Sequence, residues 1–594
     1  MASKQMKLLD LSNNPLFVLT RPDPAARLWD GGSAGGSQNG SVGSSKRGAV
    51  LSGRGGVGLT RFNHAFAAGL HNIAGHNDNG DSDCDSILYD YGWDVESAIE
   101  IFSSGLRENT ALEELRLSCT SMHPDATLAV FSALAVDVDN MGARSNDVLE
   151  SLDVSHNCLL KPLPVVEGAE GAATALKQQV EELSVMLHNL VALQRLNLSA
   201  TFLTFEQMTV LMLGIPSAVD VNRVHDDTFL KARTNKVERD HGVVENTSLT
   251  ELDLSEIPMG DKGLEEVIQE LLKGNKKLRT LLLRAIGQAR TVGMQALAEV
   301  LQTNQHLQVL DLSKNAGIKD EGAQKLAYAL MHNNRHAGDG LLSINMSSTS
   351  LTAFGVEALC QALCQGLAAM SSLVAFDLSN SHLDAGRDTH TPREWTIAAA
   401  KAIGTVLRCN PGLRFLSLSR CHISAAGAGQ LAYELDNPQY DAGNSALQHL
   451  DLGYNPLGED GVKEIVIALQ SHRQLQTLSL AAVNLTTVGL SEVLHQFERN
   501  ASLEELDLTH NFIKTVNPKA FASFNANNTT LRRIDLRWNR IEESECAALG
   551  SLFTLEAKTA ALATMGEAKS LRQQLRDLLN LDEEAEEAPY VLCV

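Results

Sequence analysis

Residues 53 to 60 come closest in this chain to a nucleotide-binding motif. The segment reads GRGGVGLT, with the glycine and threonine spacing of a phosphate-binding loop, but Leu59 stands where such a loop requires a lysine. Without that cation the β and γ phosphates lose their main positive partner, and no apolar strand precedes the loop. We therefore expect no nucleotide site here.

Other patterns that carry chemistry are also incomplete. Residues 76 to 85 are rich in Asp and Asn, but placing Gly80 at the sixth position of a calcium loop puts Gly75 first and Ser86 twelfth, where carboxylates are required. The sequence has no His-Glu-x-x-His motif and no paired Cys-x-x-Cys motif. We predict a protein that is not an enzyme and that holds no metal or cofactor.

Composition narrows the expected partner and compartment. The chain has 49 Lys and Arg against 72 Asp and Glu, and this net charge of −23 disfavours a nucleic-acid backbone and favours a partner with a basic surface. Its nine cysteines are scattered without disulfide or zinc spacing, which suits a reducing compartment. No signal-peptide pattern and no run of about 18 apolar residues is found. We expect a cytoplasmic protein with no membrane segment.

One repeat fills most of the chain, with apolar residues at its first, fourth, sixth and eleventh positions and often a small or amide residue at its ninth. Thirteen copies begin at Leu112, Leu149, Leu193, Leu249, Leu278, Leu307, Leu341, Leu373, Leu413, Leu447, Leu475, Leu503 and Leu531. A fourteenth, detached copy begins at Met6. Positions are numbered below from the first apolar residue of each copy.

Each copy predicts a short strand followed by a helix. Positions four and six point to one side of a strand, while positions three, five, seven and eight are expected on the other, concave side. An Asn at position nine, such as Asn315, can bind backbone groups where the strand turns away, whereas Ile286 and Val483 weaken that ladder. Apolar residues at helical spacing follow, and glycines such as Gly355 and Gly461 permit close approach of the helix.

Successive copies start 28 or 29 residues apart from Leu249 to Leu307 and from Leu447 to Leu531. This period resembles the ribonuclease-inhibitor-like subfamily of leucine-rich repeats, which also occurs in nucleotide-binding innate-immune receptors and in the Ran GTPase-activating protein. The resemblance covers roughly residues 93 to 541. It implies an α/β solenoid, a horseshoe with parallel strands on the concave face and helices on the convex face. It does not imply one activity, because members of this class bind unrelated partners.

The spacing of the copies also predicts the domain organisation. The expected parts are an N-terminal segment at 1–92 with the detached copy and a Gly/Ser-rich disordered tract at 31–58, an array of about 13 repeats at 93–541 with insertions near 160–180, 216–246 and 385–395, and a helical cap with an acidic tail at 542–594. Helices are also expected at 63–74 and 93–106. A partner-binding or self-association role for the C-terminal helices remains open.

Position five supplies the first candidate binding feature. Seven of the thirteen copies have Asp there, among them Asp451, Asp507 and Asp535. Stacked parallel strands would bring neighbouring aspartates to about 5 Å from each other and concentrate negative potential along one groove. We predict partner contacts there, although Leu-Asp-Leu is also a common phrase of this repeat type and favours a structural role.

Position eight supplies the second candidate feature, near the C-terminal end of the array. Tyr454, His510 and Trp538 occupy it, with Arg420 in an earlier copy and Arg537 beside Trp538. Tyr, Trp and Arg dominate binding hot spots, and only 5% of this chain is aromatic. We predict a partner site on this row, with a role in capping the array as the alternative.

Two functions are therefore compared. The first is a non-catalytic scaffold that presents its concave face and insertions to a protein partner, with membership of a larger assembly as a special case. The alternative, from the resemblance, is a GTPase-activating protein of the Ran-activator type. That type ends in a longer acidic tail than residues 582 to 587, and none of its catalytic residues can be aligned here. A stimulated GTP-hydrolysis assay separates the two.

Overall fold

A computed structural model describes most of the repeat array. The described residues are 6–13, 95–122, 124–134, 148–160, 179–184, 186–187, 190, 192–212, 248–333, 340–365, 373–386, 391–436, 446–541 and 591–593. Several expected features lie outside them, namely the Gly/Ser-rich tract, the helix at 63–74, most of the first two insertions and the C-terminal helices at 543–581. The chain divides into two compact units, Met1–Leu203 with Asp240–Asn246, and Thr204–Arg239 with Thr247–Val594.

The first unit contains the early repeats. Its elements are β1 (Leu8–Asp10), α3 (Val95–Glu108), β2 (Glu114–Arg116), α4 (Pro124–Leu134), β3 (Ser151–Asp153) and β4 (Arg195–Asn197). All neighbouring strands are parallel, and the detached N-terminal copy pairs directly with the first copy of the array, Leu9 opposite Leu115. The helix expected at 93–106 is α3. The N-terminal copy is therefore remote in sequence but adjacent in the sheet.

The second unit contains ten repeat strands, β5 to β14, and a described helix follows each of the first nine. Its elements are α6 (Phe205–Met212), β5 (Glu251–Asp253), α8 (Gly260–Lys262), the π-helical η3 (Gly263–Ile268), α9 (Gln269–Gly274), β6 (Thr280–Leu282), α10 (Thr291–Leu301), β7 (Val309–Asp311), α11 (Lys319–His332), β8 (Ser343–Asn345), α12 (Ala353–Gln365), β9 (Ala375–Asp377), α13 (Pro392–Cys409), β10 (Phe415–Ser417), α14 (Ala425–Leu435), β11 (His449–Asp451), α15 (Gly458–Leu469), β12 (Thr477–Ser479), α16 (Thr487–Phe497), β13 (Glu505–Asp507), α17 (Pro518–Asn527), β14 (Arg533–Asp535) and β15 (Val591–Cys593).

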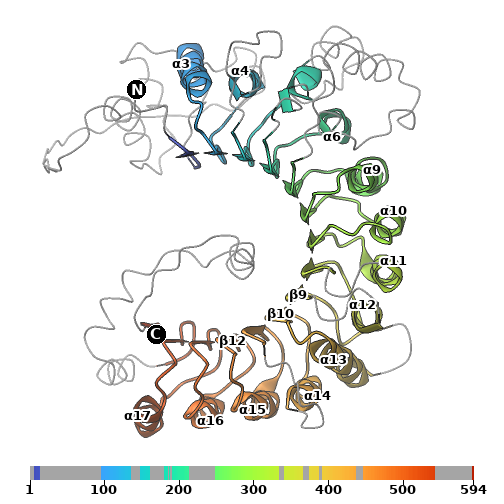
Figure 1. Cartoon of the computed structure of the whole chain (residues 1–594). Helices are drawn as coiled ribbons and strands as arrows, with labels where there is room; N and C mark the ends of the chain where they lie inside the picture. The colour runs from blue at the N-terminus through green and yellow to red at the C-terminus, as the bar shows by residue number, and fades with distance from the viewer. Residues whose placement is uncertain are drawn as a thin grey trace, which may run out of the picture. The chain divides into compact units, whose positions relative to one another are not determined.

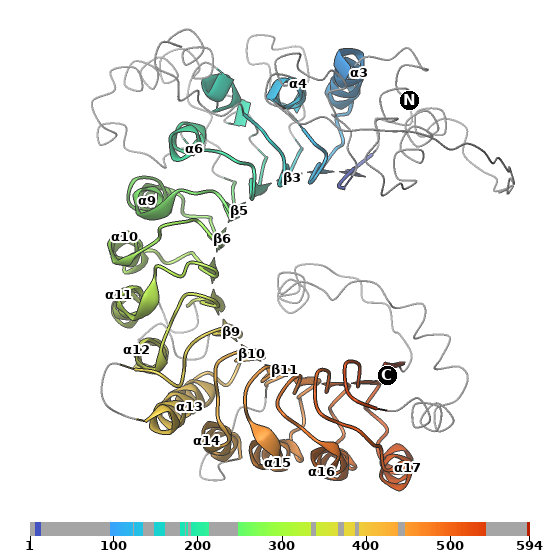
Figure 2. The ribbon, with the colours of Figure 1, turned by 180° about the vertical axis from the view of Figure 1, so that it is seen from behind.

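Strands and helices of the second unit form two layers. The strands pair in parallel in chain order, and position four always faces position four, as Leu450 faces Leu478. Helices α9 to α17 lie on one side of this strand layer in Figure 1, and the view from behind in Figure 2 shows the same arrangement. This confirms the expected α/β leucine-rich-repeat solenoid. None of the described helices is long and apolar enough to cross a bilayer.

The core lies between the two layers and is made from the repeat's apolar positions. In the copy that starts at Leu447, the first, fourth, sixth and eleventh side chains (Leu447, Leu450, Leu452 and Leu457) are at most 1% exposed. Burying each such leucine stabilises the fold by about 2 kcal/mol. The predicted pattern is therefore confirmed as the packing unit of the array.

Position-nine asparagines join each repeat to the one before it. The amide nitrogen of Asn455 donates to the carbonyls of Leu418 and Leu452, at 2.8 and 2.9 Å. Its amide oxygen accepts from the backbone N–H groups of Cys421 and Ile423, at 2.9 and 3.0 Å. The predicted backbone role of this residue is confirmed, and its reach across two copies explains why it is fully buried.

Because the asparagine bonds to the preceding copy, the expectation that Ile286 and Val483 weaken the ladder at position nine is corrected. The backbone N–H of Ile286 donates to Asn315 Oδ1 at 2.9 Å, and that of Val483 donates to Asn511 Oδ1 at 3.0 Å. The asparagine of the following copy thus satisfies the turn of a copy whose own ninth residue is apolar. The ladder is not broken at these backbone groups.

A second set of asparagines, which the sequence analysis missed, closes several of the helices. Asn500 Oδ1 accepts from the N–H groups of Ser502 and Leu503 at 2.9 and 2.8 Å, immediately before the next strand. His472 takes the same place in the preceding copy, where Nδ1 accepts from Leu475 N–H at 3.0 Å. The signal was an Asn three residues before position one, as also at 275, 304 and 528.

Close helix approach at the predicted glycines is confirmed. A methyl group at Gly355, the third residue of α12, would collide with the carboxylate of Asp320. That carboxylate accepts from the N–H and the hydroxyl of Thr352, at 2.8 and 2.7 Å, just before α12 begins. Helix α11 thus helps to fix the start of α12.

The third expected insertion, near 385–395, contains the start of a helix. Helix α13 begins at Pro392, with Thr391 as its N-cap and Glu394 completing a capping box. Residues 391 to 395 therefore form a helix start. The sequence signal was Thr-Pro-x-Glu, a proline at the first helical position after a capping residue.

Candidate partner-binding surface

Position eight lies in the turn that follows each strand, and its backbone is left-handed. Arg420, Tyr454, His510 and Trp538 have φ between 57° and 62°. Their N–H groups donate to the next copy where one is described, as Tyr454 donates to the carbonyl of Ala481 at 2.6 Å. Since these backbone N–H groups are occupied, binding at this edge depends on the side chains.

The predicted side chains form one continuous contact series, called here the position-eight row. The guanidinium carbon of Arg420 lies 3.9 Å from the ring centre of Tyr454. Tyr454 and His510 have ring centres 5.9 Å apart, and His510 stacks on Trp538 at 5.7 Å. The intervening copy has Ala482, whose small side chain allows the rings to meet across it. The structure therefore brings together four of the predicted residues.

The rings of this row are exposed. Trp538 is 75% and Tyr454 is 38% solvent-accessible. The guanidinium group of Arg537, next to Trp538, binds a carboxylate. Its Nη2 and Nε lie 2.6 and 3.0 Å from the two carboxylate oxygens of Asp535. It forms part of a local ion pair rather than of the row.

A second row, at position ten, was missed by the sequence analysis. His382 and His422 have ring centres 5.2 Å apart, and Arg540 lies 4.8 Å above the ring of Phe512, which is 40% exposed. His422 also lies 3.9 Å from a carboxylate oxygen of Asp384. The available signal was an aromatic or cationic residue between the buried ninth and eleventh positions.

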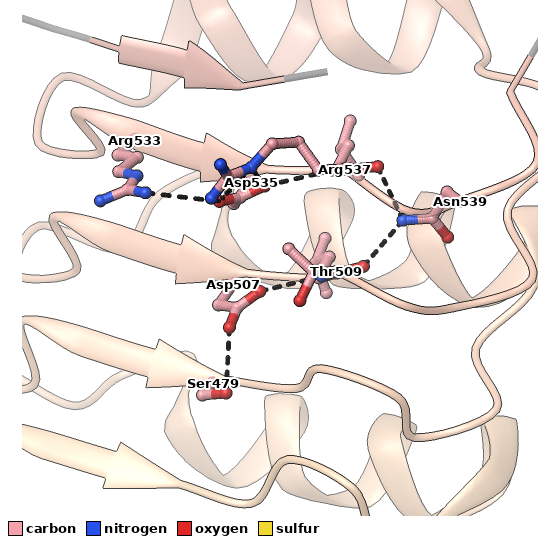
Figure 3. Close-up of polar contacts among 9 residues, drawn as sticks. Ser479, Asp507, Thr509, Arg533, Asp535, Arg537 and Asn539 are labelled. Atoms are coloured by element: carbon pink, nitrogen blue, oxygen red, sulfur yellow. Dashed lines mark hydrogen bonds and ion pairs between the residues drawn. The ribbon is translucent and has the colours of Figure 1, made fainter. Parts of the chain in front are cut away.

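The position-five carboxylates bind their own turns. Oδ1 of Asp451 accepts the N–H of Gly453 at 2.9 Å, and Oδ1 of Asp507 accepts that of Thr509 at 2.9 Å. Asp535 likewise accepts the N–H of Arg537 at 3.1 Å, as Figure 3 shows. Each carboxylate therefore caps the N–H two residues beyond it, which is a structural role.

The expected close approach of neighbouring aspartates holds at one place among the strands of the second unit. Asp507 and Asp535 lie on adjacent strands, and there Arg533 and Arg537 approach Asp535 to 3.3 and 2.6 Å. Between β7 and β13, Asn or Ser alternates with Asp at position five, as Ser417 separates Asp377 from Asp451. This alternation separates like charges on the ladder.

Burial affects the ionisation of the carboxylates inside this alternating ladder. Burial raises the pKa of Asp377 to about 6, although hydrogen bonds from Ser379 oppose the rise and the charges of Asp311 and Asp451 add to it. Burial also raises the pKa values of Asp311 and Asp451. These groups are therefore poorly suited to act as exposed anions for a partner.

No group of three or more His, Cys, Asp or Glu suited to a metal ion occurs within the described ranges. The six cysteines found there (Cys119, Cys158, Cys360, Cys364, Cys409 and Cys421) are all free thiols.

Comparisons with known proteins agree with this architecture. Leucine-rich-repeat family models match residues 473–541 and, separately, 245–267, 303–327 and 443–466. The chain is 28% identical over 57% of its length to NACHT, LRR and PYD domains-containing protein 14 of Mus musculus, of which it covers 31%. It is 31% identical over 38% of its length to the Mus musculus ribonuclease inhibitor, of which it covers 44%.

Among solved structures, a leucine-rich-repeat protein of Leptospira interrogans aligns with 76% of this chain and 90% of its own, at 16% identity and a TM-score of 0.31. The curated relatives named above are covered over less than half of their own length. The repeat, the parallel strand ladder, the family-model matches and the similarity to ribonuclease inhibitor identify the chain as built of leucine-rich repeats of the ribonuclease-inhibitor-like kind.

Proposed function

We propose that this protein is a non-catalytic scaffold whose C-terminal repeats bind a protein partner through the position-eight row. The observation that carries this proposal is the exposed contact series from Arg420 through Tyr454 and His510 to Trp538. Large rings held against one another lose little side-chain entropy on binding, which is the property that makes Tyr and Trp hot-spot residues.

The backbone at these positions supports a binding role over a structural one. A residue with a β-carbon is disfavoured in the left-handed region by roughly 1 to 2 kcal/mol, and Asn or Gly suits it better. Tyr454 and Trp538 stand there with φ of 58° and 62°, and their rings are exposed. Folding alone does not favour such residues, so a partner gives a reason for them.

The carboxylates of Asp451, Asp507 and Asp535 take a supporting part in this proposal. They hold the turns from which Tyr454, His510 and Trp538 project, because each caps the N–H one residue before the ring. Arg537 contributes through the same ion pair with Asp535. The proposal therefore assigns partner contact to the rings and turn geometry to the aspartates.

The test uses the full chain as bait, followed by titration of the recovered protein. We expect Tyr454→Asn and Trp538→Asn each to weaken binding by about 2 kcal/mol, close to 30-fold, with a melting temperature equal to or above that of the wild type. Tyr433→Asn is the matched control, because Tyr433 is 59% exposed on α14, away from the row. Unchanged affinity in both row variants would refute the proposal. A GTP-hydrolysis assay with small GTPases tests the alternative activity.

A further inference from the structure

The position-eight row and the position-ten row lie in the turns that follow the strands of the C-terminal repeats, and this surface is called here the turn edge. Its charged side chains are cationic, whereas the whole chain has a net negative charge. In the last six copies, positions eight and ten are occupied by Asn380, His382, Arg420, His422, Tyr454, Pro456, Ala482, Asn484, His510, Phe512, Trp538 and Arg540. None is acidic, although Asp and Glu outnumber Lys and Arg by 72 to 49 in the chain. This edge therefore offers cations and rings to a partner, in a molecule of net charge −23.

Two arginines of this surface stack on aromatic rings. Arg420 lies over the ring of Tyr454 and Arg540 lies over the ring of Phe512. Neither makes an ion pair with any carboxylate of the described residues. Stacking on a ring holds a planar guanidinium in place and leaves its N–H donors available for a carboxylate.

We infer that this edge binds a short, extended, carboxylate-rich polypeptide segment that also has aromatic or aliphatic side chains. The inference rests on the proposed function and specifies its partner. An acidic partner replaces the basic partner that the net charge of the chain suggested. The position-five carboxylates already accept hydrogen bonds from backbone N–H groups of their own turns and do not attract a basic partner. At physiological ionic strength the charge of the rest of the chain is screened beyond about 8 Å, so contacts at the edge decide the preference.

The spacing of the arginines sets the length of the segment. Arg420 and Arg540 belong to the copies of β10 and β14, which are four strand steps apart. At about 4.8 Å per step the distance along the ladder is roughly 19 Å, or about six residues of extended chain. Acidic residues at the two ends of such a segment reach the arginines, while apolar side chains between them contact Tyr454, His510 and Trp538.

A polypeptide is favoured over a nucleic acid at this edge. Backbone binding of nucleic acid depends on several Lys and Arg contacts to successive phosphates, whereas these rows supply two arginines. A short segment with carboxylates at its ends matches two separated guanidinium groups, each of which binds a carboxylate in a bidentate manner. RNA remains an outcome of the test.

The test measures fluorescence anisotropy of three probes on the full chain. The probes are a peptide with two glutamates at each end of Leu-Tyr-Leu-Phe, the same peptide with lysines in place of glutamates, and a ten-nucleotide oligouridine, all with one dye. We expect the acidic peptide to bind about tenfold or more tightly than the other two and to weaken as salt rises. Equal or tighter binding of the lysine peptide or the RNA, or no binding of the acidic peptide, would overturn the inference.

Variants assign the effect to the two arginines. Arg420→Gln and Arg540→Gln should each weaken binding of the acidic peptide about five- to tenfold, while Lys463→Gln, a matched charge change on α15, should have no effect. Thermal melting confirms that each variant is folded. Because the two arginines lie in different copies, one folded variant is enough for the test if the other fails to fold. If neither arginine variant changes binding, the inference fails. If the natural partner still requires Tyr454 and Trp538 in that case, the proposed function stands with a partner of different chemistry.

Discussion

At the scale of single residues, Asp377 illustrates why the position-five stripe is misread from sequence. An aspartate every second strand resembles a binding stripe, but the carboxylate of Asp377 accepts the N–H of Ser379 at 2.8 Å and is 7% exposed. Asn345, at the same position on the neighbouring strand, makes the same bond to Ser347 at 3.0 Å. The position thus requires an oxygen acceptor, and charge is incidental to it.

This leads to a prediction for Asp377→Asn. The folded pKa of about 6 lies above the unfolded value near 3.9, so the native state binds more protons between these pH values and wild-type stability falls as pH rises through that window. The amide keeps the acceptor and removes the buried charge. We expect the variant to be about 2 kcal/mol more stable than the wild type above pH 7 and about equal to it near pH 4, by urea denaturation. A variant less stable than the wild type at pH 7.5 would contradict this.

The contact series of the position-eight row was predicted only in part. The identities and order of Tyr454, His510 and Trp538 were visible in the sequence, because they share one position of the repeat. The cation of Arg420 over Tyr454 and the row at position ten were not recognised. The contact of Arg420 with Tyr454 depends on the left-handed backbone of both residues, which leaves little trace in composition.

At the scale of elements, one side chain of Asn455 ties two successive turns together. It serves two N–H groups of the preceding copy and carbonyls of both copies while fully buried. A threonine at the same position, such as Thr349, donates to the carbonyl of its own copy at 2.6 Å. The amide thus makes bonds to the preceding copy that are not made by this hydroxyl.

We expect Asn455→Ala to destabilise the protein by about 3 kcal/mol, because buried N–H and carbonyl groups lose their partners. Asn455→Thr is the matched variant, and it should lose about half as much because it restores one carbonyl bond. Differential scanning calorimetry of both variants measures this order. If alanine and threonine were equally tolerated, the buried amide would not hold the two turns together.

Helices and strands were predicted where the repeat spacing is regular. They were missed where the spacing is irregular and local contacts such as a capping box determine where an element begins. Strands occur at positions three to five of each copy because the apolar period fixes both register and face, as at β11 and β12. The start of α13 at Pro392 was taken for part of an insertion, because its capping box follows an irregular gap in the repeat spacing. Strand β15, whose Leu592 pairs with Ile534, has no repeat signature at all.

At the scale of the whole molecule, each copy is stabilised mainly by its neighbours. In the second unit, strands of adjacent copies bond to each other, and position-four leucines such as Leu478 and Leu506 stack in register. In such an array the free energy of unfolding is close to a sum of repeat and interface contributions. The loss of one copy therefore spreads first to the copies beside it.

We expect Leu506→Asp to unfold the C-terminal copies before the earlier copies of the same unit. Leu506 is 2% exposed, so an aspartate there would place an unpaired carboxylate in the core at a cost of several kcal/mol. Hydrogen exchange should show lost protection at β12, β13 and β14 and retained protection at β5, β6 and β7. Leu506→Met is the control that keeps the volume and should protect all six strands. Uniform loss of protection across the unit would mean that its copies unfold as one cooperative block rather than through nearest-neighbour interfaces.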